Sequence, residues 1–185
     1  TKNLMYDVAI AMLPATIWGV MQFGIYSLIV VVATVLSCVL SEYLFETLMH
    51  KPVTISDGSA LVTGMILGLN MPPAIPLWMP ILGGVFAIIV VKQLYGGLGQ
   101  NWMNPALAAR CFMLISFAQA MTKFTDPVTD AVASATPLAA IKAGDTYDLA
   151  AMFIGKIPGT IGEVSVIALL IGAAYLLVKK VITIR

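Results

Sequence analysis

Charged residues are scarce in this sequence. Only 10% of its 185 residues are Asp, Glu, Lys or Arg, whereas 60% are hydrophobic; soluble domains carry about 25% charge. A soluble domain of this size has too little interior to bury so many apolar side chains. We therefore expect the lipid bilayer to be the solvent, and the fold class to be an all-α polytopic membrane protein.

Cysteine, histidine and clustered basic residues are also rare. The net charge is +1 with no basic run, which excludes nucleic acid as a partner. Cys38 and Cys111 lie in apolar segments without metal-ligand spacing, so we expect two buried thiols. The single histidine, His50, adjoins Lys51 and is expected at the surface, and the eleven methionines show no clustered pattern. The sequence therefore predicts neither a metal site nor a catalytic acid–base pair.

Two long segments, 8–41 and 58–91, contain no charged residue. Because a membrane helix needs about 20 apolar residues, each segment must be divided. The expected breakpoints are Pro14, Gly19, Gly24, Pro72, Pro73 and Pro76. With the later apolar segments, this predicts about six transmembrane helices, near 5–20, 23–46, 58–71, 77–95, 105–121 and 161–178. The third is short for a crossing, so we expect it to be half-length or buried among the others.

The pattern divides the chain into three parts. Residues 1–121 hold five membrane helices, 122–160 form a charged extracytoplasmic loop, and 161–185 contain the sixth helix. Six crossings place both chain ends on one side, which the basic residues identify as cytoplasmic. The basic residues assigned to that side are Lys2, Lys51, Lys92, Lys179, Lys180 and Arg185.

A run of small residues in the charged loop ends in Thr136-Pro137. Pro137 favours an extended conformation at Thr136, which would project its hydroxyl from a non-helical segment. The small neighbours Ala133, Ser134 and Ala135 leave room for a bulky group and for an enzyme that attaches it. The pattern suits covalent attachment of a flavin at Thr136, but ordinary loops contain the same residues.

Five further stretches, in order along the chain, carry a resemblance to a known family. They are SEYLFE at 41–46, SDGSALVTG at 56–64, KQLYGGLG at 92–99, NPA at 104–106 and PGTIGE at 158–163. Through them the chain resembles the D subunit of the Rnf-type (Rsx) electron transport complexes. It is more distantly similar to the B subunit of the sodium-translocating NADH:quinone reductase.

The resemblance implies a cofactor and its attachment residue. In that family FMN is joined by a phosphoester to threonine in the motif Asp-x-x-(Ser/Thr)-Gly-Ala-Thr. Asp130, Ala135 and Thr136 match its fixed positions, while Ala133 and Ser134 replace the Ser/Thr and Gly positions with other small residues. We therefore expect Thr136 to carry FMN, with Asp130, Ser134 and Ala135 around it.

The resemblance also implies the setting. The expected fold is the first half of an inverted repeat similar to urea transporters, plus the first helix of a truncated second repeat. The expected location is the bacterial cytoplasmic (inner) membrane, with the flavin loop on the outer face. The implied complex couples ferredoxin–NAD electron transfer to sodium or proton movement. Its partners are an FMN-bearing subunit, iron–sulfur subunits and, for maturation, a flavin transferase.

A glycine-rich loop at 96–104 separates the fourth and fifth helices. Its glycines allow close approach of a ligand, and Asn101 and Asn104 offer amide groups to a flavin edge or an ion. The resemblance allows a second, non-covalent flavin (riboflavin) here. The competing interpretation is a tight turn, with Asn104 as N-cap and Pro105 as the first helical residue.

Three charged residues lie at membrane depth or at helix ends. Arg110 lies about 8 Å along the fifth helix, where a charge is either functional or extends to the head groups. Glu163 and Asp57 suit either a coupling ion or a helix start. We expect Arg110 near the cytoplasmic side and Glu163 near the outer side.

Two other functions fit the residues. A transporter or channel-like protein without a redox cofactor would also use helices broken at prolines and glycines. A structural membrane subunit would need no site at all. A flavin bound at Thr136 distinguishes the redox subunit from both alternatives.

Overall fold

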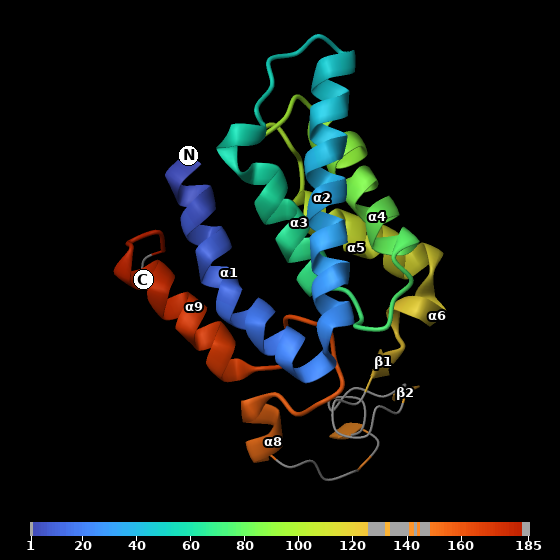
Figure 1. Cartoon of the computed structure of the whole chain (residues 1–185), viewed down its shortest axis with the longest axis vertical. Coiled ribbons are helices and arrows are strands. Elements are labelled where there is room, and N and C mark those ends of the chain that lie inside the picture. Colours follow the sequence, from blue (N-terminus) through green and yellow to red (C-terminus); the bar gives the residue numbers. More distant parts are fainter. Residues whose placement is uncertain (1, 126–131, 134–140, 143, 145–148, 183–185) are drawn as a thin grey trace.

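The computed structural model describes residues 2–125, 132–133, 141–142, 144 and 149–182 (Figure 1). This part of the chain is mostly helical. The helices are α1 (Lys2–Phe23), α2 (Ile25–Leu48), η1 (Ile55–Asp57), α3 (Ser59–Leu69), α4 (Trp78–Val85), η2 (Phe86–Gln93), α5 (Pro105–Ser116), α6 (Ala118–Met121), α8 (Leu149–Ile154) and α9 (Val166–Val178). Two short strands, β1 (Phe124–Thr125) and β2 (Val132–Ala133), pair antiparallel.

Two helices, α1 and α2, are long and apolar enough to cross a membrane; α3, α4 with η2, α5 and α9 are shorter apolar helices. The break between α1 and α2 is at Gly24, whose φ of 82° is accessible to glycine without strain. Pro14 and Gly19 were also expected breakpoints, and that expectation is wrong, because both lie inside α1.

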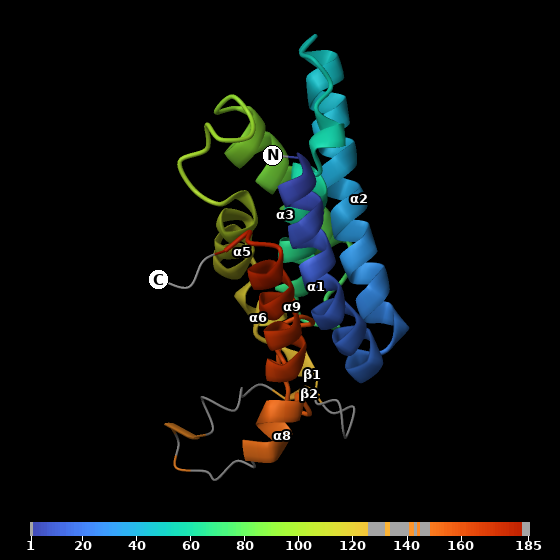
Figure 2. The ribbon, with the colours of Figure 1, turned by 90° about the vertical axis from the view of Figure 1, so that its left-hand side faces the viewer.

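The successive apolar segments alternate in direction (Figures 1 and 2). Helices α1, α3 and α5 run one way, and α2, α4 with η2, and α9 run the other. The glycine-rich loop after η2 lies at one end of the bundle, and β1, β2 and α8 lie at the opposite end. This order agrees with the predicted alternation; six membrane crossings and a urea-transporter-like repeat stay predictions.

The helices approach closely where one of them carries glycine. A Cβ atom added to Gly64 of α3 would lie 2.6 Å from Cα of Val35 on α2. A Cβ atom added to Gly172 of α9 would lie 2.3 Å from the carbonyl oxygen of Ala11 on α1. Small residues of this kind allow helix backbones to pack directly in apolar surroundings.

Two helix boundaries differ from those expected. The fifth helix ends at Ser116, and α6 follows after Phe117, rather than continuing unbroken to residue 121. The sixth begins at Val166, because the hydroxyl of Ser165 caps it by accepting from the amide of Ala168 at 3.3 Å.

The residues just before α9 fold back into the bundle instead of extending that helix. The amides of Ile161 and Gly162 donate to the carbonyls of Met71 and Leu69, at 3.1 and 2.8 Å. Ile161 is fully buried. This returning segment, 158–165, therefore meets the C-terminal end of the half-length helix α3.

Candidate functional site

The predicted flavin-attachment residues Asp130, Ser134, Ala135 and Thr136 lie outside the described residues. The structure describes the two motif residues between them, Val132 and Ala133, as strand β2. Its partner β1 follows directly on the helical region, at the bundle end opposite the glycine-rich loop.

The shape of the glycine-rich loop depends on three glycines with a positive backbone φ. Gly96, Gly97 and Gly99 have φ values of 108°, 96° and 87°. A Cβ atom at Gly97 or Gly99 would meet no atom within 4 Å, so the requirement for glycine at these two positions is conformational.

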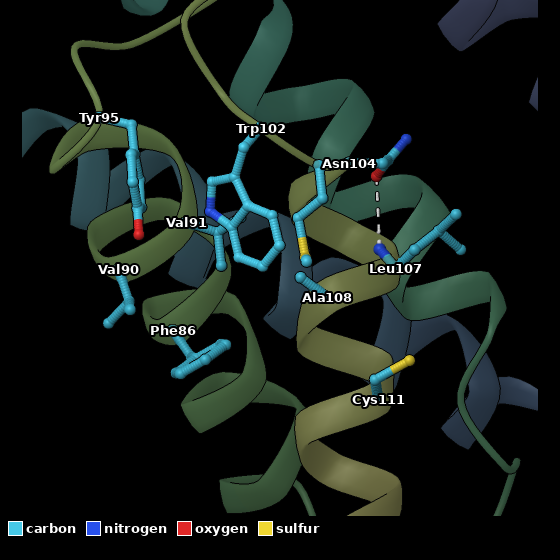
Figure 3. Close-up of a pocket in the computed structure, with 10 residues that line it drawn as sticks. Phe86, Val90, Val91, Tyr95, Trp102, Asn104, Leu107, Ala108 and Cys111 are labelled. Atoms are coloured by element: carbon cyan, nitrogen blue, oxygen red, sulfur yellow. Dashed lines mark hydrogen bonds between the residues drawn. The ribbon is translucent and has the colours of Figure 1, made fainter.

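Asn104 is the N-cap of α5, as predicted. Its side-chain oxygen accepts hydrogen bonds from the amides of Ala106 at 3.0 Å and Leu107 at 3.3 Å, the second of which is drawn in Figure 3. Pro105 occupies the first helical position. Since the oxygen is committed to the helix, only the amide nitrogen of Asn104 is free for a ligand.

An apolar cavity of about 430 Å³ lies between η2, the glycine-rich loop and α5. Tyr95 and Phe86 line one side and Leu107, Ala108 and Cys111 the other, with Trp102 between them (Figure 3). The ring centroids of Tyr95 and Trp102 are 6.3 Å apart. The lining suits a flat, largely apolar group, and Asn104 is the lining residue with a side-chain amide.

Asn101 lines a different cavity of about 230 Å³ on the inner side of the same loop. Ser59, Thr63, Lys92 and Asn104 contribute its other polar side chains. The side-chain oxygen of Asn101 is buried and has no hydrogen-bond partner in the described part of the chain. The two asparagines that the sequence singled out are therefore neighbours in one loop, but they differ in hydrogen bonding.

Arg110 and Glu163 were expected at opposite sides of the membrane, and that expectation is wrong. The Arg110 guanidinium donates to Glu163 Oε1 at 3.2 Å and to Asn70 Oδ1 at 2.5 Å. Thr160 donates to the second carboxylate oxygen of Glu163 at 2.9 Å. The cause is the returning segment, which brings Glu163 to the C-terminal end of α3. The positive charge of Arg110 is also favourable at this end of the α3 dipole.

Asp57 was expected either to start the third helix or to bind a coupling ion. Its Oδ1 accepts from the amide and the hydroxyl of Ser59, at 2.7 and 2.6 Å, which confirms that structural role. His50 is exposed as predicted. Of the two cysteines, Cys38 is buried and Cys111 is exposed, so the prediction of two buried thiols is wrong for Cys111.

A buried polar network was missed from the sequence. The Lys92 ammonium, which is 1% exposed, donates to both carboxylate oxygens of Glu42 at 2.8 Å and to Ser59 Oγ at 2.5 Å. Lys92 was counted among the basic residues of the cytoplasmic side, and that side stays a prediction; the structure places its side chain in the core. Glu46, also buried, accepts from Gln93 Nε2 at 3.1 Å and from the amide of Thr54 at 2.9 Å.

The sequence contains only part of the signal for this network. Glu42 and Glu46 are four residues apart and therefore on one face of an apolar helix. Lys92 follows an apolar run, but the sequence does not reveal that η2 is π-helical or that Lys92 and Gln93 are buried on it, a winding that is frequent at functional sites. The described residues contain no group of three or more His, Cys, Asp or Glu side chains suited to a metal ion.

Comparison with known proteins gives a match over the full chain. The model of the NQR2, RnfD, RnfE family matches residues 1–185. The chain is 46% identical, over 191 residues, to the D subunit of the Na(+)-translocating ferredoxin:NAD(+) oxidoreductase complex of Acetobacterium woodii. That alignment covers 100% of this chain and 60% of the relative.

Two other relatives show the same pattern of coverage. Identity is 40% to the D subunit of the proton-translocating ferredoxin:NAD(+) oxidoreductase complex of Clostridium ljungdahlii, over 98% of this chain and 59% of the relative. The chain is 33% identical to the D subunit of the ion-translocating oxidoreductase complex of Rhodobacter capsulatus, over 98% of this chain and 61% of the relative. The chain thus spans about three fifths of the length of these relatives.

Proposed function

Because this chain belongs to the NQR2, RnfD, RnfE family, we propose that it is a membrane subunit of an ion-translocating electron transport complex and carries electrons on an FMN bound covalently to Thr136. The observation that carries this proposal is the full-length similarity to proteins named as the D subunit of such complexes. The two helices of membrane-spanning length and the four shorter apolar ones support the membrane location.

The motif residues supply the attachment chemistry. The Thr136 hydroxyl forms the phosphoester, and the small side chains of Ser134 and Ala135 leave its approach open. Asp130 matches the acidic position that begins the family motif. When bound, FMN supplies the one- and two-electron chemistry, while the protein supplies position and surroundings. No catalytic acid–base pair is required for electron transfer.

The arrangement of the segments supports the proposed topology. Six alternating segments would return both chain ends to one side, which we assign to the cytoplasm of a bacterial cell. The flavin loop then faces outward. The proposed partners are an FMN-bearing subunit on that outer side, iron–sulfur subunits, and the flavin transferase that loads Thr136.

We assign the 430 Å³ cavity beside the glycine-rich loop to a second, non-covalent flavin, riboflavin. Tyr95 and Trp102 offer aromatic contact to an isoalloxazine ring, and the Asn104 amide nitrogen offers a donor to its polar edge. Asn101 lies on the far side of the loop, so its role is to shape the loop from within.

One observation favours a second function, an ion transporter without a redox cofactor. Helix α3 is only 11 residues long, and its C-terminal end meets the returning segment beside Arg110 and Glu163. Broken helices that end inside a bundle are typical of transporter binding sites. A protein of that kind would hold no flavin after denaturation.

The test is flavin fluorescence in a denaturing gel, after co-expression with a flavin transferase. We expect a fluorescent band from the wild type and from Thr136→Ser, which keeps a hydroxyl, and none from Thr136→Ala. Thr129→Ala, in the same loop but outside the motif, is the matched control and should remain fluorescent. A wild-type band without fluorescence, with the transferase active on another substrate, would overturn the redox proposal.

A further inference from the structure

A third cavity, which we call the β1 cavity, lies at the end of the bundle where the attachment motif begins. Its walls come from the connection between α3 and α4 (residues 74–76), from Gln119 and Ala120 of α6, and from Lys123 and Thr125 beside it. The volume is about 380 Å³, within the range of about 300–1,000 Å³ that is typical of ligand pockets. The aromatic cavity, by contrast, adjoins the glycine-rich loop at the opposite end (Figure 1).

The apolar wall of the β1 cavity is held in place by the rest of the bundle. Ile75 is 1% exposed, and its carbonyl oxygen accepts a hydrogen bond from the Tyr26 hydroxyl of α2 at 2.9 Å. At the start of α6, Phe117 packs edge-on against Trp78 of α4, with ring centroids 5.2 Å apart. Because these elements are already fixed, a ligand would bind here with little ordering cost.

The polar side chains of the β1 cavity are hydrogen-bond donors, and one of them is a cation. Gln119 offers an amide, Thr125 a hydroxyl and Lys123 an ammonium. Within the described part of the chain, Lys123 forms no ion pair and no acidic residue lines the cavity. The lining therefore suits a flat group that has an apolar face and an edge rich in acceptors or negative charge.

Strand pairing brings the attachment motif to this cavity. Phe124 pairs with Ala133 in an antiparallel ladder, so the chain leaves Ala133 in the direction that leads from Phe124 back to Lys123. Paired Cα atoms lie about 5 Å apart. Thr136 follows Ala133 by three residues, which span at most about 11 Å. A flavin joined to Thr136 through its phosphate and ribityl chain therefore reaches the β1 cavity.

We propose that the β1 cavity receives the isoalloxazine ring of the FMN on Thr136, and that the positive charge of Lys123 raises the reduction potential of this flavin. The apolar wall contacts one face of the ring, and Gln119 and Thr125 donate to its carbonyl oxygens. A flavin that gains more electrons than protons becomes negatively charged, so a nearby ammonium stabilises its reduced form. This inference rests on the proposed FMN attachment and names the residues that position the ring.

The experiment is a potentiometric titration of the intact complex in detergent, followed by flavin absorbance. Low ionic strength is used because salt screens exposed charges. The titration of the Thr136→Ala complex is subtracted, since it reports every flavin except this FMN. Lys123→Met should disfavour reduced FMN at least about tenfold, equal to about 30 mV for a two-electron couple. Lys123→Arg keeps the charge and should keep the wild-type potential.

Lys156→Met is the matched control for positive charge at this end of the bundle. Lys156 is exposed, follows α8 and does not line the β1 cavity. Its replacement should leave the potential unchanged. Equal potentials in the wild type and Lys123→Met would overturn the role of Lys123. An equal shift in Lys156→Met would overturn it too, because any lysine at this end would then have the same effect.

A steric substitution tests where the ring lies. Ala74 is an exposed residue of the cavity wall, so Ala74→Trp fills the space without disturbing the core. If the ring occupies the cavity, Ala74→Trp displaces it, and adding Lys123→Met should then change the redox equilibrium by less than about twofold, because the two sites are coupled. A tenfold effect of Lys123→Met both with and without Ala74→Trp would overturn the cavity as the ring site.

Flavin fluorescence in a denaturing gel separates this inference from the proposed function. Lys123→Met and Ala74→Trp should both give fluorescent bands, because neither residue belongs to the attachment motif. Fluorescent bands with unchanged potentials would overturn the β1 cavity and leave the FMN proposal standing. A wild type without a fluorescent band would overturn both. Loss of the band in Lys123→Met alone would assign Lys123 to attachment and overturn its effect on the potential.

Discussion

The guanidinium of Arg110 lies 3.2 Å from the carboxylate of Glu163, although the two residues are 53 positions apart. Arg110 belongs to α5, and Glu163 to the returning segment before α9. Asn70, at the C-terminal end of α3, accepts a second hydrogen bond from the same guanidinium nitrogen. One side chain therefore fastens the returning segment to the end of the half-length helix, which fixes where α9 begins.

The Arg110–Glu163 pair should contribute little by itself. The two side chains are 35% and 51% exposed, so solvent screens their attraction, and the coupling free energy in a double-mutant cycle should be about 0.2–1 kcal/mol. Arg110→Ala should cost more, about 1–3 kcal/mol, because it also removes the bond to Asn70. Glu163→Gln should cost less than about 1 kcal/mol, the cost of an exposed pair.

The measurement is denaturant unfolding in detergent of the two single variants and the double variant. Raising the salt concentration should reduce the coupling between residues 110 and 163 but not the loss of the Asn70 bond. A coupling several times larger than this range would mean that the pair is desolvated in the membrane.

Breaking the Lys92–Glu42 pair should be strongly destabilising, unlike breaking the exposed Arg110–Glu163 pair, because both of its side chains are buried. Lys92→Met leaves two carboxyl groups without any ammonium and should lower the free energy of unfolding by about 3–5 kcal/mol. Adding Glu42→Gln removes the orphaned charge, so the double variant should recover part of that loss.

Thermal unfolding of the wild type, Lys92→Met and the Lys92→Met/Glu42→Gln double variant compares the three directly. Lys180→Met, at an exposed lysine, is the control and should change stability by less than about 0.5 kcal/mol. A double variant that is less stable than Lys92→Met would show that Glu42 keeps its charge through another partner.

The sequence predicted the fold to the level of its apolar segments. Each of the six predicted segments contains a helix, because uncharged runs bounded by proline, glycine or charge leave few alternatives in a bilayer. The N-cap at Asn104 and the helix-start role of Asp57 were also predictable, since they depend on neighbouring residues. The prediction of a break at Pro14 is wrong because helices in apolar surroundings tolerate proline when neighbouring groups satisfy the backbone carbonyl that it leaves unpaired.

The polar contacts were not predictable in the same way. Lys92 meets Glu42 across 50 positions, and Arg110 meets Glu163 across 53. Each contact depends on which faces of two helices meet, or on a segment that folds back. Charge counting assigned Lys92 only to a side of the membrane, because it cannot distinguish a lysine at a membrane edge from one buried beside an acid.

Close helix packing makes Gly172 sensitive to the smallest substitution. In Gly172→Ala the new Cβ would lie 2.3 Å from the backbone oxygen of Ala11, so α9 must move away from α1. We expect a loss of about 1–3 kcal/mol in the free energy of unfolding. The matched control is Ala174→Ser, two residues along on an exposed position, which should be nearly neutral in the same unfolding assay. Equal stability of Gly172→Ala and wild type would mean that α1 and α9 pack more loosely than described.

The aromatic cavity beside the glycine-rich loop should lose its ligand when Trp102 is removed. Trp102 lines the 430 Å³ space together with Tyr95 and Phe86, so Trp102→Ala takes away the largest contact surface of a stacked ring. We expect the riboflavin released by acid from the purified complex to fall at least about tenfold, the equivalent of about 1.4 kcal/mol. FMN fluorescence should be unchanged, because strand β2 of the attachment motif lies at the other end of the bundle.

Trp78→Ala is the matched control, since Trp78 packs edge-on against Phe117, away from this cavity, and it should keep its riboflavin. Asn101→Ala separates the two cavities of the loop. Asn101 lines the inner cavity but not the aromatic one, so this variant should release less riboflavin only if the loop itself changes shape. Loss of riboflavin in both Trp102→Ala and Trp78→Ala would point to general destabilisation, whereas full retention in Trp102→Ala would remove the aromatic cavity as the flavin site.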